Sequence, residues 1–286
     1  MRLFGIFLLF LLFIGCNKEK LKAPDAFFIK PESITVAVTN STLQGTTSHK
    51  ISDIWYYVDG KFKGAFPAGN MFPVTVSGPT RLTFFAGIKN NGIAATRQPY
   101  EFYESLNFDT TVSQGTIVKR NFEFKYKSAV KFHWLEDFEG FGTTSGISIK
   151  NSSNTDTSFA IATSTLAPFP NVFEGTKCLY FAVDNTKRAA QYESTSTFNL
   201  PKSGEPVYLE MNYKCTAPFE VGVHNGSNYY YVAGINTSSD WNKIYIQLSS
   251  GVSTLSGNCG LYIRTFKNNT DAVSEFWIDN IKILSY

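Results

Sequence analysis

The sequence has 286 residues, enough for one large domain or two of ordinary size. It is 43% hydrophobic, so it can form packed cores, and its 21 glycines and 11 prolines are too few for a disordered low-complexity chain. The 26 basic and 23 acidic residues leave a net charge of +3, which argues against a broad basic face for nucleic acid. The 16% aromatic content, with 26 Phe and 15 Tyr, favours β-structure.

The start of the chain has the pattern of an export signal. Arg2 precedes twelve uncharged residues, 3–14, all large and apolar except Gly5. This run is shorter than the roughly 20 residues of a membrane-spanning helix, and it suits the apolar region of a secretory signal. It ends in Phe-Ile-Gly-Cys at residues 13–16, which resembles the lipobox of bacterial lipoproteins, with Phe13 where that family usually has Leu.

The lipobox resemblance implies that residues 1–15 are a signal peptide and that Cys16 receives lipid, including palmitate. The acyl chains would hold the protein in the membrane, since each buried CH₂ contributes about 0.8 kcal/mol. Residues 16–24 would be the lipidated tether. Asn17 is not the Asp that resembles an inner-membrane retention signal, so we expect the outer membrane of the cell envelope, facing the periplasm or the exterior. The alternative is a plain signal peptide followed by an incidental cysteine.

Residues 25–127 carry the pattern of a first β-rich module. The segments 54–58 and 61–66 flank Asp59-Gly60, the strongest short-range hairpin signal, because both turn positions need positive φ. Together with the alternating segment 34–38, further strands are expected at 74–76, 81–88, 99–103 and 117–124. Such short, closely spaced strands predict a β-sandwich of immunoglobulin type. The hairpin at 57–64 also resembles the repeats of the PEGA class, which supports the fold and not a function.

Residues 128–286 form the second expected module, after a linker near 125–131. The module opens with Leu-Glu-Asp-Phe-Glu-Gly at 135–140 and closes with Phe-Trp-Ile-Asp-Asn-Ile-Lys-Ile at 276–283. This pairing resembles the galactose-binding-like jelly rolls of many carbohydrate-binding modules. Strands are expected at 178–183, 190–200, 207–215, 219–224, 229–235, 243–248 and 260–266. With no helical stretch between them, they predict an antiparallel sandwich. The fold class is therefore all-β, with two β-sandwich domains, immunoglobulin-like and then jelly roll.

Motifs of common enzymes are missing from the sequence: there is no H-E-x-x-H, no G-x-S-x-G, no phosphate loop and no dinucleotide fingerprint. A glycosidase needs two carboxyl groups about 5–10 Å apart. The acidic cluster at 136–139 does not match the E-x-D-x-x-E pattern of β-sandwich glycosidases, and Glu210 and Glu220 are the other candidates on strands. We therefore expect a protein that is not an enzyme.

Two further groups of residues leave alternatives open. Jelly rolls that resemble this one often hold a structural calcium ion, which takes six to eight oxygen ligands. The resemblance implies Glu139 and Asp279 as ligands, with Asp137 as a third, and the alternative is that these are solvated carboxylates at strand ends. Three cysteines follow the lipid site: Cys178, Cys215 and Cys259. They predict either one disulfide with a spare thiol or buried thiols, and alternation turns the last two inward.

Binding is the chemistry that the sequence favours. Sugar sites combine flat aromatic rings with short polar groups, carboxylates or Arg. We assign the strands at 190–200, 219–224, 229–235 and 260–266 to one concave sheet. Its outward positions give the candidate ligand-binding residues Gln191, Glu220, His224, Tyr229, Tyr231, Tyr262 and Arg264, beside Glu193. The alternative is that tyrosines occupy these faces through β-propensity alone.

The sequence therefore predicts a membrane-anchored, non-catalytic lipoprotein that binds glycan through its C-terminal jelly roll. Because the module is nearly neutral, a neutral polysaccharide is the expected partner. The second hypothesis is a structural or adhesion subunit whose sandwich faces contact other envelope proteins. Neither hypothesis involves nucleic acid.

Overall fold

The computed structural model describes residues 26–75, 78–111, 113, 115–164, 172–267 and 270–286. The expected signal peptide, the lipid site Cys16 and the tether lie outside the described residues. The prediction of an all-β protein is confirmed, and the strands of its sheets pair mostly antiparallel. No helix within the described ranges is long and apolar enough to cross a membrane.

The first part of the chain forms two sheets around an aromatic core. Its strands are β1 (Ala26–Ala37), β2 (Asp53–Val58), β3 (Lys61–Pro67), β4 (Phe72–Thr75), β5 (Thr80–Lys89), β6 (Arg97–Pro99), β7 (Leu106–Thr110) and β8 (Ile117–Lys125). One sheet has the order β4-β1-β8, with β1 and β8 parallel, and the other has the order β3-β2-β5-β6, with β7 also on β5. A short helix α2 (Ser41–Gln44) and a 3₁₀ turn η3 (Ala94–Thr96) join strands.

Local sequence signals predicted most but not all of this part. The turn between β2 and β3 is confirmed, since Asp59 and Gly60 have φ of 47° and 77°. The strand expected at 99–103 is wrong, because β6 ends at Pro99 and the amide of Tyr103 closes a turn by donating to the carbonyl of Tyr100 at 3.2 Å. Strand β7 was not expected.

The second part packs two larger sheets face to face. Its strands are β9 (Lys131–Glu136), β10 (Ile149–Asn151), β11 (Ala160–Thr163), β12 (Lys177–Asp184), β13 (Ala189–Ser194), β14 (Val207–Cys215), β15 (Phe219–His224), β16 (Tyr229–Ile235), β17 (Ser238–Gln247), β18 (Gly260–Phe266) and β19 (Val273–Ser285). The sheet orders are β10-β13-β18-β15-β16 and β11-β12-β19-β14-β17, with β9 also on β19. A short helix α3 (Ser249–Thr254) follows β17, contrary to the expectation of no helix between the strands.

All three cysteines of this part are buried free thiols, so the structure contains no disulfide among them. Cys215 and Cys259 lie in the core between the two sheets, as alternation predicted. Burial raises the pKa of Cys178 to about 12 and that of Cys215 to about 11, so neither is a thiolate near neutral pH.

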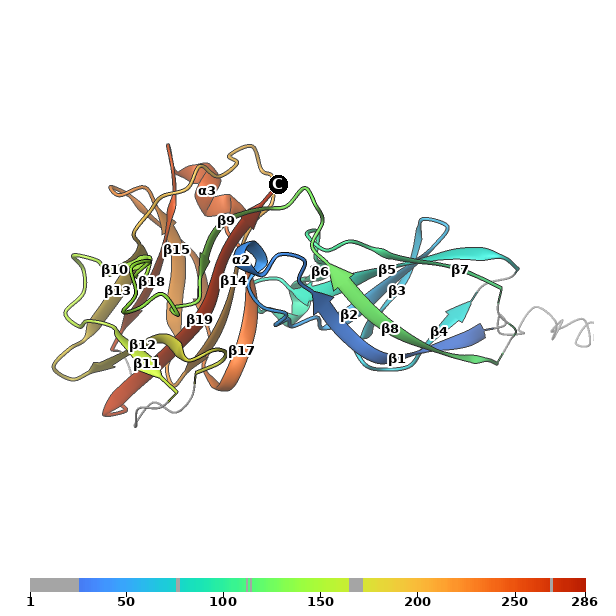
Figure 1. The fold of residues 1–286 in the computed structure, drawn as a ribbon, viewed down its shortest axis with the longest axis horizontal. Helices are drawn as coiled ribbons and strands as arrows, with labels where there is room; N and C mark the ends of the chain where they lie inside the picture. Colours follow the sequence, from blue (N-terminus) through green and yellow to red (C-terminus); the bar gives the residue numbers. More distant parts are fainter. Residues whose placement is uncertain (1–25, 76–77, 112, 114, 165–171, 268–269) are drawn as a thin grey trace, which may run out of the picture.

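The two parts lie end to end and share a buried contact region (Figure 1). Tyr208, Tyr245 and Leu284 of the second part belong to the same hydrophobic cluster as the core of the first part. Glu210 of β14 is fully buried there and accepts hydrogen bonds from the hydroxyls of Tyr100 and Tyr126, both at 2.8 Å. The segment expected as a linker, 125–131, joins β8 to β9, and Tyr126 within it is buried in the contact between the two parts.

Two ammonium groups share the Glu210 carboxylate. Lys243 Nζ lies 2.8 Å and Lys282 Nζ 3.5 Å from Glu210 Oε2. Burial alone would raise the pKa of Glu210, but attraction by the two lysines outweighs burial and lowers it to about 2. One carboxylate cannot balance two cations, so burial and repulsion by Lys243 lower the pKa of Lys282 to about 8.

Candidate functional site

The four strands assigned to one sheet do lie together, in the order β13-β18-β15-β16. Their alternate residues, including Val221, Val223, Leu261 and Ile263, enter the core between the sheets. The seven predicted ligand-binding residues are therefore on the opposite, outer face of this sheet. They differ in accessibility: Tyr229 and Tyr231 are 38% and 51% exposed, Glu220 and Arg264 are half-buried, and Gln191, His224 and Tyr262 are buried.

Aromatic rings cluster at the β15–β16 end of the outer face. The rings of His224 and Tyr229 stack with centroids 5.5 Å apart, and Tyr262 meets Tyr229 edge-on at 5.5 Å. Burial lowers the pKa of His224, so its ring is neutral near pH 7. The Tyr229 hydroxyl donates a hydrogen bond to Glu193 Oε1 at 2.7 Å, and Gln191 Nε2 donates to the same oxygen at 3.2 Å. The cluster therefore has fixed polar groups beside its rings.

Two glycines let these rings lie flat on the sheet. A Cβ at Gly222 would be 2.4 Å from the Tyr262 ring, and a Cβ at Gly260 would be 2.5 Å from Nε2 of His224. Glycine inside a strand commonly marks such a close approach. Sequence reasoning named the rings and missed the glycines, although two outward-facing glycines in neighbouring strands were the available signal.

An ion pair and a small hollow adjoin the aromatic cluster. Arg264 donates to Glu220 Oε2 from Nε at 2.9 Å and from Nη2 at 2.6 Å, and its guanidinium lies 5.4 Å from the centroid of the Tyr262 ring. The hollow has a volume of about 250 Å³, and its lining includes Glu220, Tyr231, Gly234, Asn236, Arg264 and Phe266. Exposed Tyr231 therefore lines the same hollow as the Glu220–Arg264 ion pair, in which each charge is held by the other.

The predicted calcium ligands lie near one another but are already hydrogen-bonded. Glu139 accepts from the amides of Thr176 and Lys177, both at 2.7 Å. Asp279 is buried, and burial together with repulsion by Glu139 and Asp137 raises its pKa to about 8. Such mutual repulsion favours a cation at this place. Within the described part of the chain, however, no three His, Cys, Asp or Glu side chains converge as metal ligands, so calcium stays a prediction.

The carboxylates considered for glycosidase chemistry are each engaged elsewhere. Glu136 accepts hydrogen bonds from the Phe138 amide at 2.7 Å and from Ser148. Glu210 is buried between the two parts of the molecule, and Glu220 is paired with Arg264. Each of these three carboxylates is therefore held by contacts of its own.

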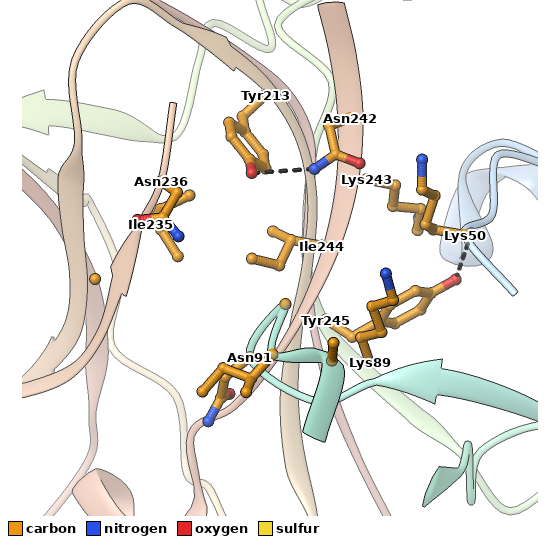
Figure 2. Close-up of a pocket in the computed structure, with 14 residues that line it drawn as sticks. Lys50, Lys89, Asn91, Tyr213, Ile235, Asn236, Asn242, Lys243, Ile244 and Tyr245 are labelled. Carbon is orange, nitrogen blue, oxygen red and sulfur yellow. Dashed lines mark hydrogen bonds between the residues drawn. The ribbon is translucent and has the colours of Figure 1, made fainter. Parts of the chain in front are cut away.

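A second, larger cavity lies where the two parts meet (Figure 2). It has a volume of about 530 Å³ and is lined by Lys50, Lys89 and residues 91–94 from the first part, and by Tyr213, residues 234–236 and residues 242–245 from the second. The amide of Lys50 donates to the Tyr245 hydroxyl, and Asn242 Nδ2 donates to the Tyr213 hydroxyl, both at 3.0 Å. Sequence reasoning missed this cavity, because its lining comes from distant segments that no local motif connects.

No family model matches the sequence, and no curated protein matches it. Solved structures of carbohydrate-binding modules resemble about half of the chain. A family 29 module complexed with mannohexaose shares 12% identity over 44% of this chain and 91% of its own, with a TM-score of 0.30. The module TmCBM61 in complex with β-1,4-galactotriose shares 14% identity over 48% and 88%, with a TM-score of 0.32. A family 30 module of a Clostridium thermocellum cellulosomal cellulase shares 16% over 47% and 88%, with a TM-score of 0.33.

Proposed function

We propose that the protein is a non-catalytic, membrane-anchored lipoprotein that binds glycan on the outer face of the β10-β13-β18-β15-β16 sheet. The observation that supports this most directly is the pair of exposed tyrosines beside rings that lie flat on the strands. Sugar rings present C–H faces that stack on such aromatic surfaces. Tyr229 and Tyr231 offer these surfaces, and the Tyr229 ring packs against the rings of His224 and Tyr262.

Polar groups on the same face suit the hydroxyl groups of a sugar. Burial alone would raise the pKa of Glu193, but hydrogen bonds from Ser152, Tyr229 and Gln191 outweigh it and lower the pKa, so the carboxylate is charged at neutral pH. Arg264 and Glu220 hold each other at the edge of the 250 Å³ hollow. Groups that are fixed before the ligand arrives lose little conformational entropy on binding.

The anchor in this proposal is the lipid on Cys16, joined to the first β-module by the tether 16–24. The first module would act as a spacer that holds the sugar-binding face away from the membrane. This places the protein in the outer membrane of the cell envelope, facing the periplasm or the exterior.

A second candidate function is adhesion to an envelope protein, and one surface of the first module favours it. The ring of exposed Phe62 lies 5.2 Å from that of Trp55 and 5.4 Å from that of Tyr57, and Tyr57 lies 5.1 Å from Phe85. These four aromatic residues form a row on strands β2, β3 and β5. Surface patches of this kind are typical of protein interaction sites.

A glycan array separates the two functions. The protein to use is the chain from residue 24 onwards, which contains both hydrophobic cores and every described strand. We expect it to retain a defined group of oligosaccharides, and we expect the Tyr229→Ala/Tyr231→Ala variant to lose them. An array on which the unaltered protein retains nothing would contradict glycan binding and favour adhesion.

A further inference from the structure

The lining of the cavity between the two parts of the molecule is basic. Three lysines line it, Lys50, Lys89 and Lys243, together with Asn91, Asn236 and Asn242. None of the described residues that line it is acidic. Figure 2 shows Lys50, Lys89 and Tyr245 on one side of the space and Ile235 and Asn236 on the other, with Ile244 between them. A basic, concave site of this kind concentrates anions.

Two of the three lysine charges have no partner. Lys243 is buried and forms an ion pair with Glu210 at 2.8 Å. Lys50 is exposed and Lys89 half-buried, and the ammonium group of neither makes an ion pair or hydrogen bond with any residue that the structure describes. Most other cavity groups are neutral: the amides of Asn236 and Asn242 and the hydroxyls of Tyr213 and Tyr245. The cavity therefore offers the ammonium groups of Lys50 and Lys89, unpaired among the described residues, beside neutral groups that can form hydrogen bonds with the hydroxyl groups of a ligand.

This cavity adjoins the sugar-binding face. Gly234, Ile235 and Asn236, at the end of β16, line both the 530 Å³ cavity and the 250 Å³ hollow beside Tyr231 and Arg264. The two spaces therefore adjoin at the end of β16, so a chain-like ligand on the outer face that extends past Asn236 would reach the space between the two parts. A ligand that does so meets the ammonium groups of Lys50 and Lys89.

We propose that the cavity binds a carboxylate of an acidic oligosaccharide, a polymer of uronic acids, through Lys50 and Lys89. This inference rests on the proposed function and names the glycan class. It differs from the neutral polysaccharide expected from the near-neutral C-terminal module, because Lys50 and Lys89 belong to the first module, which that expectation left out. Charge-assisted hydrogen bonds to carboxylates are about twice as strong as neutral ones, so the carboxylates should dominate selectivity.

The test compares an α-1,4-linked galacturonate tetramer with its carboxyl-reduced, neutral counterpart by calorimetric titration. The proteins are the chain from residue 24, a Lys50→Gln/Lys89→Gln variant, and a Lys61→Gln/Lys63→Gln control that removes two exposed charges from β3. We expect the acidic tetramer to bind at least about tenfold more tightly, which corresponds to about 1.4 kcal/mol. This preference should vanish in the cavity variant and persist in the control. It should also weaken between about 0.01 M and about 1 M salt, as the Debye length falls from about 30 Å to about 3 Å.

The outcomes distinguish this inference from the function on which it rests. Equal affinity for the two tetramers, or a preference that survives in the cavity variant, overturns the acidic class and leaves glycan binding standing. If neither tetramer binds but the protein retains other sugars on the array, the acidic class is likewise overturned and glycan binding stands. If inorganic phosphate binds through Lys50 and Lys89 and the acidic tetramer does not, the cavity is a site for small anions, and the proposal is wrong.

Discussion

Glu210 shows how much one buried residue can decide in this protein. Its carboxylate accepts hydrogen bonds from Tyr100 and Tyr126 of the first part and contacts Lys243 and Lys282 of the second. Sequence alternation could place Glu210 on strand β14, but it could not show that the side chain faces the other module. The burial of Glu210 results from contact between segments that are far apart in the sequence, and a local sequence pattern does not predict such a contact.

Replacing Glu210 with Gln should destabilise the fold by about 3–5 kcal/mol, because two buried ammonium groups lose their counter-ion. The measurement is urea-induced unfolding at neutral pH. Glu123→Gln is the matched control, since Glu123 is an exposed partner of Lys125 at 4.0 Å and should change stability by less than about 0.5 kcal/mol. Equal midpoints for the two variants would contradict the role assigned to Glu210.

The same residue predicts a pH dependence. The pKa of Glu210 in the folded protein, about 2, lies below its ordinary value of 4.5. Between these values the unfolded chain binds more protons, so the contribution of Glu210 to stability is complete above about pH 5 and is lost as the pH falls towards about 2. We expect the unfolding free energy of the unaltered protein to fall more steeply on acidification than that of Glu210→Gln.

Cys16 makes a prediction at the same scale. If its lipid is the anchor, Cys16→Ala should move the protein from the membrane fraction to the soluble fraction, because the twelve-residue apolar run is too short to span a bilayer. Metabolic labelling with a fatty acid checks the chemistry directly. Label that persists in the variant would disprove lipidation at this residue.

At the scale of elements, the sequence predicted strands where alternation or a turn motif was strong and missed them elsewhere. Among the described strands, β7 pairs with β5 alone, and it is short, with polar Asn107 and Asp109 along it, so it carries little apolar pattern. Helix α3 is built from residues with low helix propensity, and packing holds it: a Cβ at Gly251 would lie 2.7 Å from Val223. Tertiary contacts, not local propensity, decide both elements.

The β2–β3 hairpin gives a clean test of local conformation. Gly60 has φ of 77°, and a Cβ added there meets no atom within 4 Å, so Gly60→Ala tests the backbone alone. We expect it to destabilise the protein by about 1–2 kcal/mol, the cost of the left-handed region for a residue with a side chain. Lys61→Ala, at an exposed neighbouring position, should change the unfolding midpoint little. A neutral Gly60→Ala would show that the turn relaxes to another type.

Calcium belongs to the scale of elements as well, because the predicted ligands join the loop after β9 to β19. If Ca²⁺ binds the folded state alone, a 100-fold excess over Kd should add about 2.7 kcal/mol of stability. The melting temperature of the protein should then rise with Ca²⁺ and fall with a chelator, and Glu139→Gln should remove the response. A melting temperature that ignores both additions would count against the metal site.

At the scale of the whole molecule, the sequence predicted which residues share the outer face of the β13-β18-β15-β16 sheet, but it did not predict the cavity. Period-two alternation alone placed Tyr229, Tyr231 and Arg264 on one face, since each strand keeps its inward side in the core. The cavity at Lys50 and Lys89 arises only when the two parts pack through Tyr208, Tyr245 and Leu284. A binding site formed by both parts therefore depends on how the parts pack together, which local sequence patterns do not show.

The most direct test of glycan binding is calorimetric titration of the chain from residue 24 with an oligosaccharide that the array identifies. Stacking on one aromatic ring is worth roughly 1–3 kcal/mol, by analogy with base stacking. We therefore predict that Tyr229→Ala/Tyr231→Ala weakens binding by more than about tenfold. Phe62→Ala is the control, because Phe62 of the first module is 51% exposed, as Tyr231 is. It should leave the affinity unchanged. Equal affinities of the tyrosine variant and the unaltered protein would contradict the proposed site.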